Sequence, residues 1–407
     1  MEVNAGQVMG NTRPTWRNLL YFVVNILVLP AGVNLGALYR MNDFSALEQA
    51  LEQASAQHLT PGVALACGRE DTLYFSRVLG WASLQPQPLP IQEQTLFDLA
   101  SLTKVLATSL LIMRRCEAVG LDLDAPLDRL LPSHYPPDKA ALTLRQLLAH
   151  AGGLPAHVPF YRDLPPEPAD PQAQRLAVLR AVRDTPLVCA PGTETRYSDL
   201  GFILLGELLE LLEGDRLDRL CETQLFAPLG LQRTFFVHLD DPLPQARLPQ
   251  TAFAATEDCP WRGRMVCGQV HDENGYLLRG VAGHAGLFST LGEVQALARL
   301  FLRCLAGGSS FLQAETVAAF IRRQQLVPGS SRALGWDTPS TGTTCGRYFS
   351  PRAFGHTGFT GTSIWMDPEG ERFVVLLSNR VHPTRNNSQF GPLRPHLHDL
   401  AMTAMAT

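Results

Sequence analysis

Polar and apolar residues alternate with helical spacing where the patterned part of this chain begins. Residues 44–57 repeat the letters A-L-E-Q, which predicts an amphipathic helix. Pro61 and Gly62 end this helix. Two short runs, 63–67 and 72–78, then predict a pair of strands joined by a polar turn.

Longer apolar segments follow in the middle of the chain. Residues 101–119 are apolar on nearly all sides, which predicts a buried helix closed by Gly120. Residues 200–212 predict a second strongly apolar helix. The proline-rich stretch 155–192 is expected to wrap around the surface. Further helices are predicted over 143–150, 292–305, 314–324 and 395–405.

Strands return near the C-terminus, where 361–367 and 372–378 predict an antiparallel pair across a tight turn. Strands at both ends of the chain, with helices between them, predict an α/β fold. We expect a mostly antiparallel sheet flanked by helices, built from both chain ends, with an inserted and mainly helical region. The predicted boundaries are 42–402 for the domain, about 42–115 and 287–402 for its sheet part, and about 116–286 for the insert.

Composition fits a globular protein with no electrostatic attraction for nucleic acid. The 407 residues are 45% hydrophobic and 18% charged, which is ample material for a core. A net charge of −4 and a pI near 6.3 argue against a nucleic-acid partner. The eight cysteines include no C-x-x-C pair, so neither a zinc knuckle nor a disulfide framework is indicated, and free thiols favour a reducing compartment.

The N-terminus points to a different compartment. Residues 19–38 form an uncharged stretch behind Arg13 and Arg17, long enough to span a bilayer with its N-terminus inside. We therefore predict an extension, 1–41, that anchors the protein in a membrane with the remaining domain outside the cytoplasm. In the alternative, the chain really starts at Met41 and the protein is cytoplasmic.

The candidate chemistry starts from one lysine. Only Lys104 and Lys139 are lysines among the 34 basic side chains, and Lys104 lies in an apolar run where an unpaired lysine is rarely buried. Ser101 stands three residues earlier and shares its helix face. Burial and the helix dipole are expected to lower the lysine pKa, so that it could accept the serine proton. In the alternative, Ser101 is a plain N-cap and Lys104 reaches solvent.

Tyr197-Ser198-Asp199 is the second candidate element, in a loop directly before the apolar helix 200–212. A tyrosine beside a lysine could relay the serine proton and later protonate the leaving group. Asp199 taken alone is explained as a helix N-cap.

His356-Thr357-Gly358 is the third element, ahead of the C-terminal strand pair. Gly358 would let a substrate backbone approach, Thr357 offers a hydroxyl, and His356 could be a charge-tunable group near a substrate carboxylate. In isolation the triplet is a turn before a strand.

In this order, S-x-x-K, a Tyr-x-Asn-type triplet and a Lys/His-Thr-Gly strand resemble the active-serine penicillin-recognising enzymes. The chain resembles the class C β-lactamase-like serine hydrolases and penicillin-binding proteins, a group of D-alanyl-D-alanine carboxypeptidases, β-lactamases and esterases. The resemblance covers roughly 43–402. Supporting stretches are 97–104, 147–155 and 197–206, with 270–274 and 280–288 similar to a penicillin-binding-protein-4-like subgroup.

The resemblance implies roles for these residues. Ser101 would be the acylated nucleophile, Lys104 and Tyr197 the acid/base pair, and the backbone N–H groups of Ser101 and Phe359 the oxyanion hole. The remaining substrate-binding positions would be Asp199, His356, Thr357 and Gly358.

Two residues depart from the family pattern. Asp199 stands where asparagine is commoner, and it could hold Lys104 protonated, which would leave Tyr197 as the base. His356 replaces the lysine usual in β-lactamases, so a permanent positive charge is missing. Both changes argue against efficient β-lactam hydrolysis.

Other histidines give no metal site. His271, Asp272 and His284 lack regular ligand spacing, so we expect no metal or other cofactor and assign the two histidines to bracing the pocket rim. His150, at a predicted helix C-terminus, is explained by the helix dipole.

We therefore predict a serine hydrolase that works through an acyl-enzyme, most simply a D-Ala-D-Ala carboxypeptidase acting on a small or peptide substrate such as a cell-wall peptide. The alternatives are a carboxylesterase of small acyl esters, a weak β-lactamase, and a catalytically silent penicillin-fold binding protein.

Overall fold

The structure is a computed structural model that describes residues 42–340, 342 and 344–406. The predicted membrane segment 19–38 lies outside these residues. Within them, no helix combines the length and the apolar character needed to cross a bilayer.

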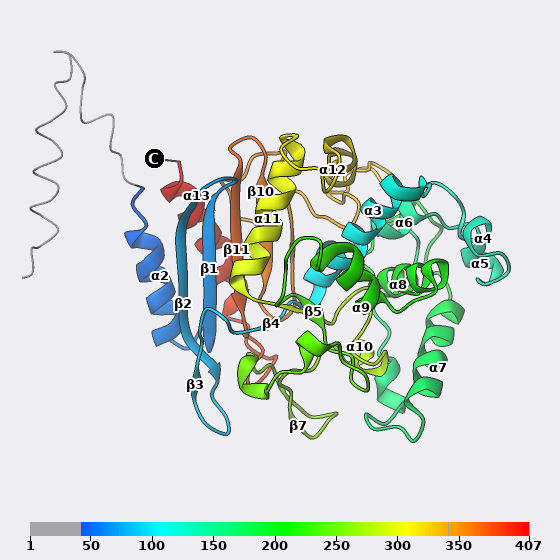
Figure 1. Ribbon diagram of the computed structural model, residues 1–407, viewed down its shortest axis with the longest axis horizontal. Coiled ribbons are helices and arrows are strands. Elements are labelled where there is room, and N and C mark those ends of the chain that lie inside the picture. Colours follow the sequence, from blue (N-terminus) through cyan, green and yellow to red (C-terminus); the bar gives the residue numbers. More distant parts are fainter. Residues whose placement is uncertain (1–41, 341, 343, 407) are drawn as a thin grey trace, which may run out of the picture. The chain divides into compact units, whose positions relative to one another are not determined.

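The main sheet has six strands, and both ends of the chain contribute to it, as predicted (Figure 1). All neighbouring strands pair antiparallel, and the N-terminal strand β1 lies beside the last strand β11, with Val63 opposite Ser378. In sheet order the strands are β3 (Leu89–Pro90), β2 (Leu73–Ser83), β1 (Gly62–Arg69), β11 (Arg372–Ser378), β10 (Ser363–Asp367) and β9 (Phe354–Thr357).

Helices cover both faces of this sheet because its central strands are apolar on both sides. In β1, Val63 and Leu65 pack with one helix pair, and Ala64 and Ala66 belong to the larger core on the other face. Figure 1 shows the pair on one face and a single long helix on the other. The pair is α2 (Ser45–Ala56) with α13 (Phe390–Ala404), and the single helix is α11 (Leu291–Leu305).

The middle of the chain is mainly helical, as expected. Two short sheets accompany these helices. One of these sheets joins β4 (Phe97–Asp98), β8 (Leu287–Ser289) and β5 (Phe235–Phe236), and the other joins β6 (Asp258–Cys259) and β7 (Arg264–Met265). The helices are α3 (Ser109–Val119), α4 (Leu127–Leu130), α5 (Pro137–Ala140), α6 (Leu144–Leu148), α7 (Pro171–Asp184), α8 (Asp199–Glu213), α9 (Leu217–Cys221), α10 (Glu273–Leu277) and α12 (Ala314–Ile321).

Helix α7 was not expected within the proline-rich stretch 155–192. Asp170 caps it by accepting a hydrogen bond from the Ala173 N–H, and Pro171 occupies its first turn, where proline is tolerated. Val178 and Val182 are buried on its inner face, which packs against α8. The proline-rich stretch therefore contains a helix, and one of its prolines, Pro171, occupies the first turn of that helix.

The predicted helix 101–119 is buried, but it does not begin as an α-helix. A 3-10 turn (Ala100–Leu102) and a π-type turn (Lys104–Thr108) precede α3, which ends at Gly120 with φ 66°. Such π-type turns occur often at functional sites. Ser101 is thus inside a tight turn and is not a simple N-cap.

Candidate active site

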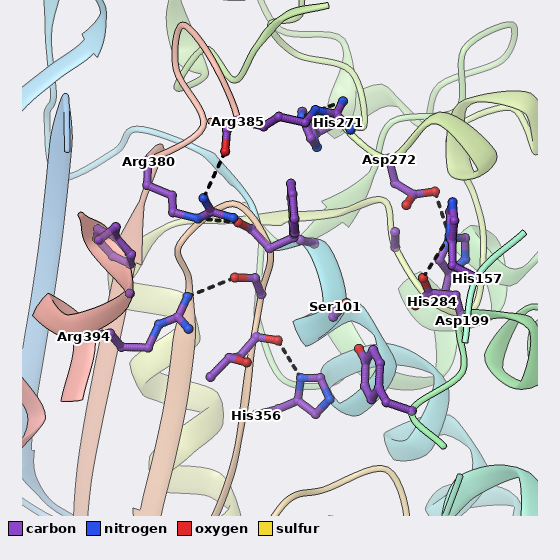
Figure 2. A pocket seen from close by; sticks show the side chains of 18 of the residues that line it. Ser101, His157, Asp199, His271, Asp272, His284, His356, Arg380, Arg385 and Arg394 are labelled. Atoms are coloured by element: carbon purple, nitrogen blue, oxygen red, sulfur yellow. Dashed lines mark hydrogen bonds and ion pairs between the residues drawn. The ribbon is translucent and has the colours of Figure 1, made fainter. Parts of the chain in front are cut away.

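Ser101 lies in the tight turn that follows β4, and it lines a cavity of ≈ 720 Å³ (Figure 2). The preceding Ala100 has a left-handed φ of 47°, which is costly for a residue with a Cβ. Asp98 accepts a hydrogen bond from the Ala100 N–H at 2.8 Å, and Thr103 Oγ1 donates to the Ala100 carbonyl at 2.6 Å. These bonds hold the turn in the conformation that presents Ser101 to the cavity.

Lys104 is fully buried one turn further on, as the spacing predicted. Its Nζ donates to Ser101 Oγ at 3.1 Å, to Asp199 Oδ1 at 2.8 Å and to the His284 carbonyl at 3.1 Å. Three acceptors match the three protons of an ammonium group. The alternative in which Lys104 reaches solvent is wrong.

The pKa of Lys104 is raised, not lowered as burial alone suggested. Burial does lower it, but the charge and hydrogen bond of Asp199, with those of Tyr197, outweigh burial. Burial likewise raises the pKa of Asp199, and the charge of Lys104 with a hydrogen bond from His157 brings it well below its usual range. The pair is therefore ionised, as the hypothesis of a lysine held protonated by Asp199 required.

Ser198, not Asp199, caps helix α8: its hydroxyl accepts from the Gly201 N–H at 3.3 Å. Asp199 is free to line the cavity, with one carboxylate oxygen on Lys104. Tyr197 also lines the cavity, with its ring centroid 4.9 Å from the Lys104 Nζ. The structure thus brings the first two predicted motifs into contact.

His150 supports Tyr197, and its explanation by a helix dipole is wrong. The imidazole is buried, packs on the Tyr197 ring at 4.6 Å and accepts a hydrogen bond at Nδ1 from the Ser198 N–H. Burial, with the charges of Arg332 and Lys104, lowers its pKa well below the ordinary value. A neutral ring gains nothing from a helix C-terminus.

The third motif ends strand β9 at the cavity wall, next to the first two. His356 is buried, and its Nδ1–H donates to the Thr357 carbonyl at 2.8 Å. Burial and the charge of Lys104 lower the His356 pKa well below its ordinary value. The expectation of a charge-tunable group here is therefore wrong, because His356 is neutral.

Gly358 and Phe359 continue the motif along the same wall. A Cβ on Gly358 would lie 2.0 Å from Thr362 Oγ1 and 2.6 Å from the Leu99 carbonyl, so only glycine fits. The Phe359 ring is half exposed and stacks on His271 at 5.7 Å. The predicted oxyanion role of the Phe359 N–H remains a prediction, in a position that lines the same cavity as Ser101.

Arginines at the cavity wall were missed by the sequence reasoning. Arg394 donates to the Gly358 carbonyl at 3.1 Å, and Arg380 donates to the Phe359 carbonyl at 2.8 Å (Figure 2). Within the described residues neither has an ion-pair partner. Burial and the neighbouring Arg380 lower the pKa of Arg394 to about 10. Two arginines from the last part of the chain thus bring positive charge to the cavity wall next to the third motif.

The two histidines expected to brace the pocket rim both line the cavity, and each contacts a carboxylate. His284 Nε2 lies 2.9 Å from Asp272 Oδ1, and His271 Nε2 lies 3.0 Å from Glu257 Oε2. Arg385 forms ion pairs with both Glu257 and Glu273. In the described part of the chain the one group with converging metal-ligand atoms is Glu257, Cys259 and Glu273, and the Arg385 guanidinium already binds its two carboxylates.

Glu257→Gln is expected to lower stability at pH 7 by about 2 kcal/mol, because it weakens a buried ionic pair. Burial raises the pKa of Glu257, but hydrogen bonds from His271 and Arg385 outweigh burial and bring it to about 2. A lowered carboxyl pKa stabilises the fold above about pH 4.5 and loses that contribution as pH falls towards 2. Urea unfolding at pH 7 and pH 3 should therefore show a smaller difference between variant and wild type at pH 3; an equal difference would contradict the assignment.

A cavity serine bonded to a buried lysine, with a tyrosine and a His-Thr-Gly strand end beside it, defines the class of active-serine hydrolases. Comparison with known proteins agrees. The β-lactamase family model matches residues 47–391, and the chain belongs to this family of serine hydrolases.

One relative, from Escherichia coli, is described as a "putative D-alanyl-D-alanine carboxypeptidase". It is 31% identical over 394 residues, which cover 88% of this chain and 87% of the relative. Solved structures share the fold. A β-lactamase-like protein from Bacteroides dorei has a TM-score of 0.64 at 18% identity, covering 90% of this chain and 100% of its own. The octameric penicillin-binding protein homologue from Pyrococcus abyssi has a TM-score of 0.67 at 19% identity, covering 89% and 77%.

Proposed function

We propose that this protein is a carboxypeptidase of the D-alanyl-D-alanine type, which cleaves peptides with a free C-terminal carboxylate through an acyl-enzyme on Ser101. The observation that carries the proposal is the pair Arg380 and Arg394. Both guanidinium groups reach the cavity wall at Gly358 and Phe359 without a carboxylate partner among the described residues. A substrate carboxylate is the partner that arginine binds best.

The proton route follows from the charges at the site. Asp199 keeps Lys104 as an ammonium, which donates to Ser101 Oγ and has no lone pair to accept a proton. Tyr197, beside the ammonium, then relays the Ser101 proton in acylation. Its phenol oxygen takes the Ser101 proton as its own O–H proton passes to the leaving amine, and C-terminal D-alanine departs as the Ser101 ester forms.

The neutral His356 supports a peptidase or esterase over a β-lactamase. Its Nδ1–H is committed to the Thr357 carbonyl, so the position offers no positive charge to a β-lactam carboxylate. The arginines that do carry a charge belong to a later part of the chain and lie against Gly358 and Phe359. We expect penicillin to acylate Ser101 and to be released slowly.

Mass spectrometry of the intact protein and release of D-alanine test this function together. The substrates are benzylpenicillin, p-nitrophenyl acetate and an N-acylated peptide ending in D-Ala-D-Ala. We expect D-alanine release and a stable penicilloyl adduct on the tryptic peptide 78–104, which contains Ser101. Ester turnover with neither adduct nor D-alanine would instead identify an esterase. No adduct and no turnover with any of the three would contradict both enzymatic functions.

A further inference from the structure

His157 and Lys104 share the carboxylate of Asp199. His157 follows the Gly-Gly-Leu-Pro stretch closely in the chain, and its side chain lines the cavity and is 41% exposed. Its Nδ1 lies 3.5 Å from Asp199 Oδ2, and Asp199 Oδ1 receives the Lys104 Nζ at 2.8 Å. Figure 2 shows the carboxylate of Asp199 next to His157, on the same side of Ser101 as Asp272 and His284. One carboxylate therefore joins the buried lysine and an exposed imidazole.

The contact with Asp199 favours one tautomer of a neutral His157 ring. With Nδ1 3.5 Å from a carboxylate oxygen, the neutral ring is stabilised with its proton on Nδ1, and Nε2 then keeps its lone pair. Within the described residues Nε2 has no hydrogen-bond partner. An aspartate that orients a histidine in this way is the arrangement by which imidazole serves as a general base. His157 is thus a base open to water in the same cavity as Ser101.

The other histidines that line the cavity, and His150 behind Tyr197, cannot act as this base. His150 and His356 are buried, and each uses Nδ1 on the backbone. His271 and His284 are buried and hold carboxylates with Nε2. Lys104 is an ammonium with three acceptors. Of the described histidines that line the cavity, His157 alone is exposed.

We propose, on the basis of the function proposed above, that His157 is the general base for hydrolysis of the acyl-Ser101 intermediate. Its Nε2 takes a proton from water while the water oxygen bonds to the ester carbonyl carbon. The bond from that carbon to Ser101 Oγ then breaks, and Oγ takes a proton from the Lys104 ammonium 3.1 Å away. Lys104 regains its proton from His157 through Asp199, so that ester and water give acid and free serine.

The dependence of deacylation on pH follows from the groups that face His157. A hydrogen bond to Asp199 raises its pKa from the ordinary 6.5, burial opposes this, and further negative charge adds to the rise. A base must be unprotonated, so deacylation is expected to slow as pH falls through a midpoint above 6.5. The charged and titratable groups on the elements around it are Asp199, Asp272 and Glu273, with Lys104 bonded to Asp199 and His284 bonded to Asp272.

His157→Gln separates this role from a structural one, because glutamine can still donate to Asp199 but cannot accept a proton from water. With p-nitrophenyl acetate we expect a burst of about one p-nitrophenol per enzyme, followed by turnover lowered by about 10²-fold. The acetyl-enzyme should accumulate in the mass spectrum, and the acid limb of the turnover profile should disappear. Hydroxylamine, which needs no general base, should restore release of the acetyl group. His396→Gln, on an exposed histidine outside the cavity, is the matched control.

Three results would overturn the proposal for His157: unchanged turnover, an unchanged acid limb, or a burst slowed as much as turnover, which would place His157 in acylation. These results differ from failure of the function itself. If the wild-type protein forms no acyl-enzyme with ester or penicillin, it is the proposed function that is wrong.

Discussion

Ser101→Ala is expected to abolish the acyl-enzyme and to lower turnover by at least about 10⁴-fold, because alanine has no oxygen that can attack a carbonyl. Stability should change little. Among the described residues, Ser101 Oγ accepts a hydrogen bond only from Lys104 Nζ, and in the variant that ammonium keeps Asp199 and the His284 carbonyl as partners. We expect a change in unfolding free energy within about 1 kcal/mol. Adduct mass and D-alanine release measure the first effect, and thermal unfolding the second.

A second serine that lines the cavity provides a control for this experiment. Ser388 also lines the cavity, but it is exposed, and within the described part of the chain no lysine donates a hydrogen bond to it as Lys104 does to Ser101. Ser388→Ala should therefore retain the penicilloyl adduct. An adduct that survives in Ser101→Ala and disappears in Ser388→Ala would show that the nucleophile has been assigned to the wrong serine.

The sequence was enough to predict the sheet and the order of the motifs. Strands near both ends have local signals, namely short apolar runs and turn residues, and a tight turn makes the two strands that it joins antiparallel. The Ser101–Lys104 spacing likewise predicts that the two side chains are close together, since side chains three residues apart share a helix face. These features depend on residues that are close to one another in the sequence, so the sequence alone is enough to predict them.

What the sequence did not reveal depends on contacts between distant segments. Arg380 and Arg394 carry no motif, and they reach Gly358 and Phe359 only in the folded chain, where β10 pairs with both β11 and β9 and α13 packs against β11. The same limit explains His157, whose partner Asp199 is 42 positions away and belongs to another element.

The charge states show this limit most clearly. Burial was expected to lower the pKa of Lys104, and burial does act in that direction, but Asp199 reverses the net shift. His356 was expected to titrate near a substrate, yet its depth in the cavity wall and the nearby Lys104 keep it neutral. A pKa depends on the distances to all neighbouring charges, and these exist only in the folded chain.

Lys104→Met is expected to lower turnover by about 10³-fold, because the ammonium that orients Ser101 and supports Tyr197 is lost. It should also lower the unfolding free energy by about 3 kcal/mol, since the largely buried Asp199 loses the partner that keeps its pKa low. Thermal unfolding and steady-state turnover measure the two effects on one preparation.

The double variant Lys104→Met with Asp199→Asn separates the effect of Lys104 on stability from its effect on turnover. Methionine fills a similar volume without charge, and asparagine removes the unpaired carboxylate, so most of the lost stability should return. Turnover should stay at the level of Lys104→Met, because no ammonium returns to Ser101 Oγ. If Lys104→Met keeps its stability, the ion pair with Asp199 contributes nothing to the fold. If the double variant recovers turnover, Lys104 acts only by balancing Asp199, and Tyr197 activates the serine without it.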